Sequence, residues 1–173
     1  MRYGTRTAGQ SVAVLRTEST IAPMRILIQR VTEAQCDIGG KTFSQIGGGV
    51  VVLVGIGRDD ADEDIEYLAR KLVALRIFDD SDGIMNLSLA QTGGEVMIVS
   101  QFTLQASTRR GNRPSWIKAA PEEISRPLYD RFVRRVEELL GKRTATGVFG
   151  ADMRITLTND GPVTIWIDSH DRD

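Results

Sequence analysis

The chain has 173 residues but only one cysteine, Cys36, and one histidine, His170. A single cysteine excludes an internal disulfide and any cysteine-rich metal site. Cys36 lies in an alternating segment, where a small buried hydrophobe is its expected role. A single histidine near the C-terminus argues against a Ser-His-Asp triad and against a histidine-based metal site. The sequence therefore predicts no bound metal.

Excess charge and long apolar runs are also missing. Lys and Arg number 22 against 23 Asp and Glu, which gives a net charge of −1. Such a chain does not bind nucleic acid through bulk positive charge, so any phosphate contact must come from local basic clusters. No run of 18 apolar residues occurs, and we therefore expect no membrane-spanning helix.

The length predicts one domain that can bury its own core. Residues 1–23 differ from the remainder, with three arginines, one acidic residue, many Ser and Thr, and no long apolar segment. This composition faintly resembles a transit peptide, but a simpler explanation is an upstream start codon, with Met24 the working start. In either case we expect 1–23 to be a disordered extension, followed by one domain over 24–168 and a tail over 169–173.

Strand signals outnumber helix signals within the domain. A first helix is predicted to start at Asp60, with Glu63 completing a capping box. A second is predicted from Pro121 to Leu140, with a kink or break at Pro127. Because the strands read mainly as hairpins, we expect an α+β fold: a strongly curved, mainly antiparallel sheet with two main helices packed on it. The expected strands cover residues 25–31, 34–38, 42–46, 50–57, 85–89, 96–99, 153–158 and 163–167.

The rest of the chain is organised around Glu95–Leu104. Its first half is an apolar run that follows two glycines, which is typical of a strand buried on both faces. Its second half, Ser100-Gln101-Phe102-Thr103, is polar without a turn signal. If the backbone stays extended, Ser100 and Phe102 face one side and Gln101 and Thr103 the other. These polar groups either cap neighbouring backbone or form a site at the end of a rigid strand, beside an Arg-rich loop.

A second polar segment, Asn159–Thr164, joins two stretches of alternating polarity. Asp160-Gly161 between strands is a hairpin signal. Pro162 lacks an N–H, and the bond before it can be cis. The plain interpretation of the segment is a tight hairpin.

Five blocks of sequence, in order, resemble the D-aminoacyl-tRNA deacylase family. The resemblance extends from Met24 to about Ile167, and the number and order of the blocks make it specific. Arg109 and Trp116 depart from the residues most frequent in the family, outside the motifs that carry activity. The blocks are MRILIQRV (24–31), VSQFTL (99–104), RRGNRPSW (109–116), GVFGADM (147–153) and NDGPVT (159–164).

The resemblance implies a cofactor-free, cytoplasmic homodimer with a barrel-like sheet. Its substrate would be the 3′ end of D-aminoacyl-tRNA, or of tRNA mischarged with glycine, with no membrane or DNA partner. An activated ester needs positioning, N–H groups for the oxyanion and water, so a strong side-chain base is not required. The catalytic segment would be Ser100, Gln101, Phe102 and Thr103. Thr103 would position rather than attack, while a hydroxyl of the terminal ribose assists the water.

The resemblance also assigns residues to recognition. Gly161 and Pro162 would form a Gly-cisPro motif that enters the partner subunit's active site and rejects L-aminoacyl groups, with Arg30 as its brace. The implied pocket and adenosine-binding residues are Ala120, Phe149, Ala151 and Met153. The candidate tRNA-phosphate contacts are Arg109, Arg110 and Arg113.

Two other functions stay open at this point. A related editing domain would remove an L-amino acid, although the intact GPVT segment argues against it. A non-catalytic, dimeric RNA-binding module would need aromatic platforms within basic charge, and only Phe102, Trp116 and Phe149 lie near basic residues. The basic residues of the second helix are either solvated surface or phosphate contacts; they are Arg131, Arg134 and Arg135, with Lys142 and Arg143 beyond.

Overall fold

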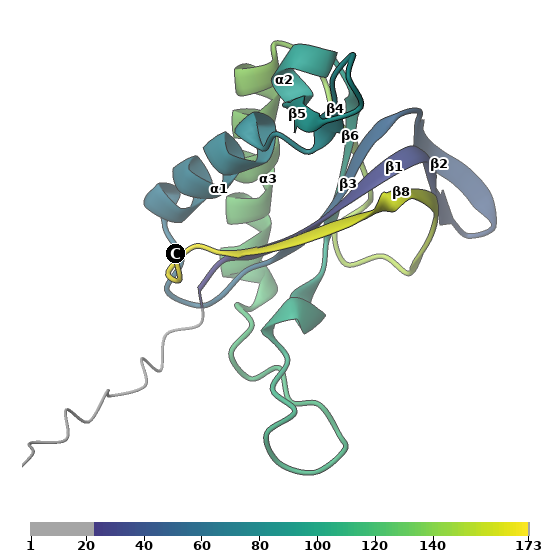
Figure 1. Ribbon diagram of the computed structural model, residues 1–173. Coiled ribbons are helices and arrows are strands. Elements are labelled where there is room, and N and C mark those ends of the chain that lie inside the picture. The colour runs from purple at the N-terminus through teal and green to yellow at the C-terminus, as the bar shows by residue number, and fades with distance from the viewer. Residues whose placement is uncertain (1–22, 173) are drawn as a thin grey trace, which may run out of the picture.

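The computed structural model describes residues 23–172, so the expected extension lies, except for Pro23, outside the described residues. The domain is α+β, with a strongly curved, barrel-like sheet (Figure 1). Six strands follow the order β2-β1-β3-β6-β7, with β8 also paired to β1. Their bounds are β1 (Arg25–Ile38), β2 (Lys41–Ile46), β3 (Gly49–Gly55), β6 (Glu95–Ser100), β7 (Ala145–Thr146) and β8 (Met153–Asp168).

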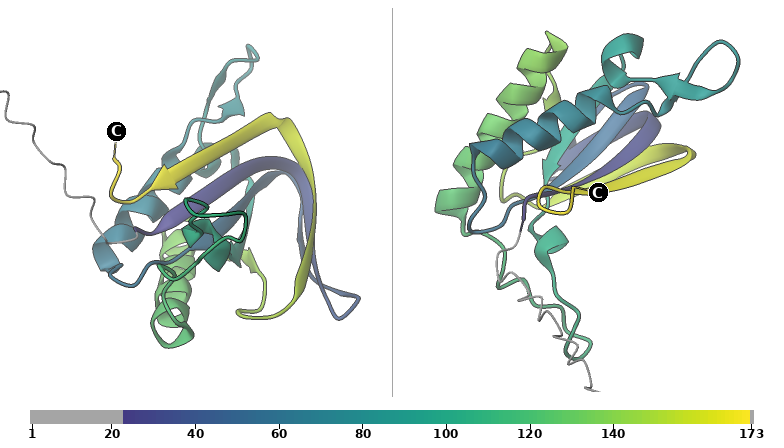
Figure 2. Two further views of the ribbon diagram at one scale, coloured as in Figure 1. Left: turned by 90° about the horizontal axis from the view of Figure 1, so that it is seen from below. Right: turned by 60° about the vertical axis from the view of Figure 1, so that its left-hand side comes forward.

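The curvature comes from the two longest strands. β1 and β8 pair antiparallel along nearly their whole length and bend together (Figure 2, left). The first half of β1 pairs with β3, and its second half pairs with β2 across the Gly39-Gly40 turn.

The two main helices, α1 (Asp62–Ala74) and α3 (Glu122–Leu140), pack on one face of the sheet, as predicted (Figure 2, right). A small hairpin of β4 (Phe78–Asp79) and β5 (Met85–Leu87) and the short helix α2 (Leu89–Thr92) lead from α1 to β6. None of the described helices is long and apolar enough to cross a membrane. The stripe that α3 buries against the sheet contains Leu128, Tyr129, Phe132 and Val136.

A second apolar cluster lies on the other face of the sheet. Cys36 is fully buried in it, as predicted, next to residues of β3 and β6. Within β6, Val96 and Ile98 belong to the helix-side core, whereas Met97 and Val99 belong to this second cluster. The prediction of a strand buried on both faces is therefore confirmed.

β6 runs parallel to β3 and β7 because α1 crosses over between β3 and β6, whereas β1 pairs antiparallel with β2, β3 and β8, so the sheet is mixed but mainly antiparallel, as predicted. The predicted start of the first helix was wrong. Helix α1 begins at Asp62 rather than Asp60, and its first turn is closed by Asp64, not Glu63, since Asp64 Oδ2 accepts the Ala61 N–H at 2.9 Å. Helix α3 is continuous through Pro127, so the break considered there does not occur, and the kink stays a prediction. Pro127 lies in the second turn and removes one backbone bond, while the packed stripe beyond it holds the helix.

The segment after Thr158 was predicted to be a hairpin, and this too is wrong. β8 continues through it and stays paired to β1 on both sides. Between the pairs Gln29–Thr164 and Val31–Asn159, β1 has one residue, Arg30, whereas β8 has four. The extra residues form a bulge that leaves the ladder and re-aims the chain.

Candidate active site

β6 ends at Ser100, and the chain turns at once into a 3₁₀ helix, η1 (Phe102–Gln105). The Gln101 N–H still donates to the Val54 carbonyl of β3 at 2.7 Å. After Gln101 the backbone adopts the tighter 3₁₀ conformation, so the chain does not stay extended as far as Thr103. The polar end of the strand is therefore a turn rather than a continued sheet edge.

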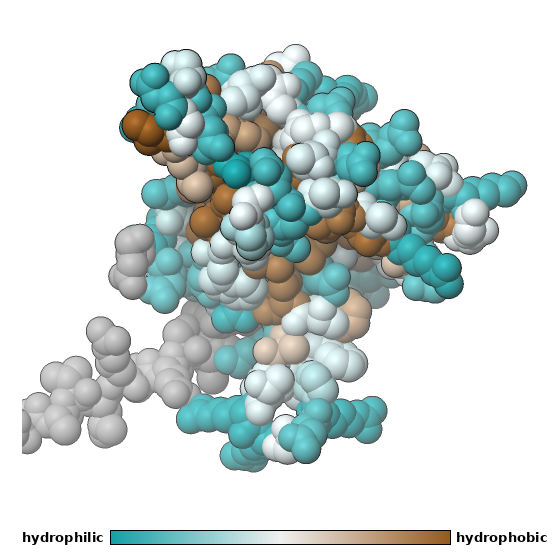
Figure 3. All heavy atoms as spheres, turned by 45° about the vertical axis from the view of Figure 1, so that its right-hand side comes forward, coloured by the Kyte–Doolittle hydropathy of each residue, from teal (hydrophilic) through white to brown (hydrophobic). Residues whose placement is uncertain are grey.

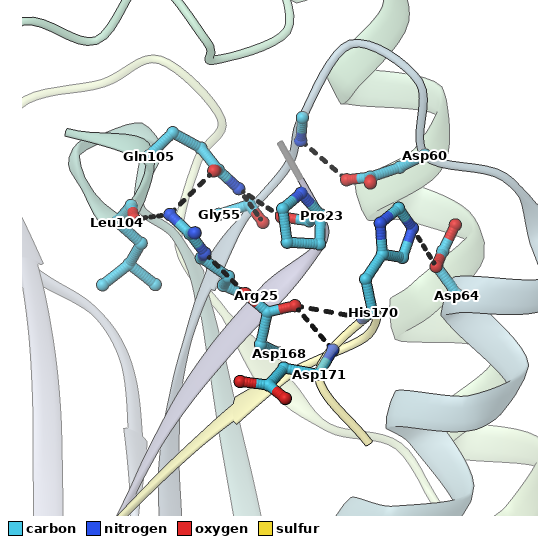
Figure 4. Close-up of polar contacts among 11 residues, drawn as sticks. Pro23, Arg25, Gly55, Asp60, Asp64, Leu104, Gln105, Asp168, His170 and Asp171 are labelled. Atoms are coloured by element: carbon cyan, nitrogen blue, oxygen red, sulfur yellow. Dashed lines mark hydrogen bonds and ion pairs between the residues drawn. The ribbon is translucent and has the colours of Figure 1, made fainter. Parts of the chain in front are cut away.

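A buried amide anchors this turn. Gln105 is 1% exposed, and its Nε2 donates to the carbonyls of Pro23 at 2.7 Å and Gly55 at 3.1 Å (Figure 4). Arg25 Nη1 donates to the Leu104 carbonyl at 3.1 Å and to Gln105 Oε1 at 3.2 Å. A buried polar network with its partners in place favours one conformation, so η1 has a fixed position.

The end of β8 in turn fixes Arg25. Arg25 Nε donates to Asp168 Oδ2 at 3.0 Å, and Asp168 Oδ1 accepts the N–H groups of His170 and Asp171 at 3.0 and 3.3 Å (Figure 4). Sequence reasoning missed these anchors because they join residues as far as 143 positions apart. The one available signal was the polar Gln105 directly after the SQFTL block.

A pocket of about 410 Å³ opens beside the turn. Ser100, Gln101 and Phe102 form part of its lining. In the space-filling view, apolar surface gathers on one face above the projecting loop (Figure 3). The other predicted lining residues are all present, namely Ala120, Phe149, Ala151 and Met153.

Thr103 lies beside the pocket rather than in its lining. Its hydroxyl accepts a hydrogen bond from Gln101 Nε2. Phe102 and Thr103 are the first two residues of η1. The first N–H groups of a helix have no acceptor within the helix, and those of Phe102 and Thr103 donate to no group among residues 23–172. Two adjacent, fixed N–H groups next to a pocket are suited to stabilise a developing oxyanion.

Tyr129 supports the wall that contains Phe149. Its hydroxyl donates to the Ile98 carbonyl of β6 at 2.7 Å, and its ring lies 5.7 Å from the Phe149 ring, centroid to centroid. Burial raises the pKa of Tyr129, so the phenol remains a hydrogen-bond donor at neutral pH. This contact ties the pocket wall to the buried strand.

The Gly161–Pro162 bond is cis, as predicted, and both residues are exposed on the β8 bulge. Arg30, 6% exposed, lies beneath them. Its Nε donates to the Asp160 carbonyl at 3.2 Å and pairs with Asp160 Oδ2 at 3.1 Å, while its Nη1 donates to the Ile77 carbonyl at 2.6 Å. None of these residues lines the pocket of the same chain.

The Arg-rich loop projects away from the domain (Figure 1). Two backbone bonds between Ser107 and Ser115, of 2.7 and 2.9 Å, close its base, and Arg109, Arg110 and Arg113 are exposed. The basic face of α3 forms several ion pairs within the chain. Its ion pairs are Arg131 with Asp62, Arg135 with Glu66 and Glu138, and, just beyond the helix, Arg143 with Glu137.

Several known proteins are similar to this chain. A D-aminoacyl-tRNA deacylase from Chromobacterium violaceum is 57% identical over 146 residues, covering 84% of this chain and 97% of the relative. One from Bacteroides thetaiotaomicron is 54% identical over 150 residues, covering 87% and 100%. Hydrolases of aminoacyl-tRNA esters are thus the class that these relatives represent.

Solved structures agree on the fold. The c-Myc DNA Unwinding Element Binding Protein has a TM-score of 0.78 at 35% identity, covering 83% of this chain and 97% of that one. A probable eukaryotic D-amino acid tRNA deacylase has a TM-score of 0.74 at 19% identity, covering 84% and 98%, and shows the fold alone. The D-Tyr-tRNA(Tyr) deacylase family matches residues 27–168, and this chain belongs to that family.

The anchoring of η1 predicts the effect of Gln105→Leu. Leucine has a similar size but cannot donate, so two buried carbonyls lose their partner. We expect the free energy of unfolding to fall by about 1–3 kcal/mol, measured by urea denaturation. The same substitution at the exposed Gln45 is the control, and equal stability of the two variants would contradict the anchoring role.

Proposed function

We propose that this chain hydrolyses the ester between a D-amino acid, or mischarged glycine, and the terminal ribose of tRNA. The observation that carries the proposal is the junction of the pocket with the start of η1, where the N–H groups of Phe102 and Thr103 donate to no group among residues 23–172. Water would add to the ester carbonyl carbon, and the bond to the ribose oxygen would break. The ribose oxygen would leave with a proton, giving free amino acid and tRNA.

Electrostatic stabilisation would supply most of the catalysis. The N–H groups of Phe102 and Thr103 would receive the oxyanion, and Gln105 and Arg25 keep them in place, so no reorganisation is needed during the reaction. A hydroxyl of the terminal ribose would assist the water. The Thr103 hydroxyl accepts a bond from Gln101, which does not activate it as a nucleophile, so its proposed role is positioning.

The pocket and the projecting loop would bind different parts of the tRNA end. The aromatic and apolar lining at Phe149, Ala151 and Met153, to which Ala120 also contributes, is suited to the terminal adenosine. The loop arginines at 109, 110 and 113 are exposed and would reach phosphates nearby. The α3 face would contribute less to phosphate binding than its arginine content suggests, because Arg131 and Arg135 pair with Asp62 and Glu66 of α1.

Rejection of L-aminoacyl groups would require a homodimer. Gly161 and Pro162 are exposed on a braced bulge but do not line the pocket of their own chain. We propose that they enter the partner's pocket, where their carbonyls capture the substrate's amino group and leave no space for an L side chain. This filter works by steric exclusion and unpaired polar groups, so it would not reject glycine.

The direct test is hydrolysis of tRNA charged with D- or L-tyrosine. We expect the D-ester to be cleaved on the order of 100-fold faster or more, measured as single-turnover release of amino acid. A preference for the L-ester would instead support the related editing domain. Binding of both without hydrolysis would support a non-catalytic RNA-binding module.

Thr103→Ala tests the positioning role. We expect the single-turnover rate to fall by less than about 100-fold, the lower range for loss of one oxyanion-hole donor, because the backbone N–H remains. Thr103→Ser, which keeps the hydroxyl, should stay closer to the wild type. Detection by mass spectrometry of an ester on Thr103 in the wild type would overturn this role and restore covalent catalysis.

Gly161→Ala tests the filter. Gly161 has φ +120°, and a Cβ there would lie 2.8 Å from Val163 Cγ2 and 3.3 Å from Arg30 Nη2. The methyl group should displace the bulge and lower the rate on D-aminoacyl-tRNA without unfolding the domain. Gly83→Ala is the control, since Gly83 also has positive φ but nothing within 4 Å of a Cβ. Wild-type rates in Gly161→Ala would refute the role of this bulge.

A further inference from the structure

Three ligand-type side chains meet outside the pocket, in the corner between the start of α1 and the end of the chain. Their ligand atoms, one each from Asp60, Asp64 and His170, lie within 4.8 Å of one another. His170 Nε2 is 3.3 Å from Asp64 Oδ1. In Figure 4 the imidazole lies between the two carboxylates.

One carboxylate oxygen in this corner is buried without a hydrogen-bond donor. Asp60 is 9% exposed; its Oδ2 accepts the Gly57 N–H at 2.6 Å, but its Oδ1 is buried and has no hydrogen-bond partner. Among the described residues, the only other buried side-chain oxygen or nitrogen in this condition is Oγ of Ser169, next to His170. A buried carboxylate oxygen without a donor is costly, and a cation would remove that cost.

The surroundings hold the carboxylates in place. Asp64 is 5% exposed, and its Oδ2 accepts the Ala61 N–H, which leaves Oδ1 toward His170. Such outer hydrogen bonds orient ligands in metal sites. Burial first, and the Asp64 carboxylate to a smaller extent, raise the pKa of Asp60 to about 6, against the lowering by the backbone N–H groups of Gly57 and Met24 and by His170. Two close carboxylates with one half-exposed imidazole thus form an electronegative corner open to solvent at His170.

The donor set indicates the kind of ion. One imidazole nitrogen and two carboxylate oxygens suit Zn²⁺ and similar divalent transition metals, whereas Ca²⁺ takes six or more oxygens. Ligands bound to one Zn²⁺ at about 2 Å lie roughly 3.3 Å apart. Small rotations, chiefly of His170 on the exposed tail, would close the present spacing.

We infer that Asp60, Asp64 and His170 form a binding site for Zn²⁺ or a similar divalent transition metal that joins the tail after β8 to the start of α1. The sequence argued against a histidine-based site because it has one histidine; the fold supplies the other two ligands. The site would also steady Asp168, two residues before His170, and through Asp168 the Arg25 contact to η1. It does not depend on the proposed reaction.

The test is calorimetric titration of ZnCl₂ into the full chain, without an affinity tag and after treatment with a chelator. We expect one Zn²⁺ per chain and a higher thermal midpoint with Zn²⁺. His170→Ala and the isosteric Asp60→Asn should each weaken binding at least about 100-fold and abolish the midpoint shift. Asp59→Asn removes the same charge from an exposed neighbour and should keep wild-type affinity.

Two results would overturn the inference. One is a wild-type chain that binds no Zn²⁺, which would leave only the ion pair between His170 and Asp64. The other is unchanged Zn²⁺ affinity in both His170→Ala and Asp60→Asn, which would place the ion elsewhere. Circular dichroism should be used to check that each variant is folded, and neither readout uses deacylation.

Discussion

The candidate site depends on the hydrogen bonds that hold the polar turn after the buried strand β6. β6 is covered on both faces, so the chain that leaves it must find hydrogen-bond partners immediately or lose stability. The Gln105 amide supplies two of these bonds, and Arg25 supplies two more to the same turn. This arrangement frees the first N–H groups of η1 for a ligand while the rest of the turn is fixed. The oxyanion stabilisation proposed at the pocket depends on both features of the turn, its available N–H groups and its fixed position.

The residues proposed to reject L-aminoacyl groups lie on a different part of the sheet. The β8 bulge places four residues opposite Arg30 alone, and the buried guanidinium holds the backbone at Asp160. The bulge is exposed and separate from the pocket of its own chain. If both features serve one reaction, a second subunit must bring them together. A dimer would then be a requirement of stereochemical selection rather than an accessory to stability.

Local patterns predicted the parts of the fold that depend on local physics. The buried run of β6 and the helix that follows Pro121 have their cause in the local sequence. Long-range pairing could not be predicted in the same way. The Asp160-Gly161 hairpin signal gave way to pairing with β1, which is more than 120 positions away. Long separations in sequence also concealed the contacts of Arg25 and Gln105 and the corner at His170. The pocket residues came from the family resemblance, because no local rule joins Ala120 and Phe149 to Ser100.

The most direct measurement is a crystal structure of the protein with a non-hydrolysable amide analogue of D-tyrosyl-adenosine. The account predicts the analogue's carbonyl oxygen about 3 Å from the N–H groups of Phe102 and Thr103. It further predicts the adenine against Phe149 and the amino group on the carbonyls of a second subunit's Gly161–Pro162 bulge. An analogue bound away from η1, or a pocket completed without any second subunit, would contradict it.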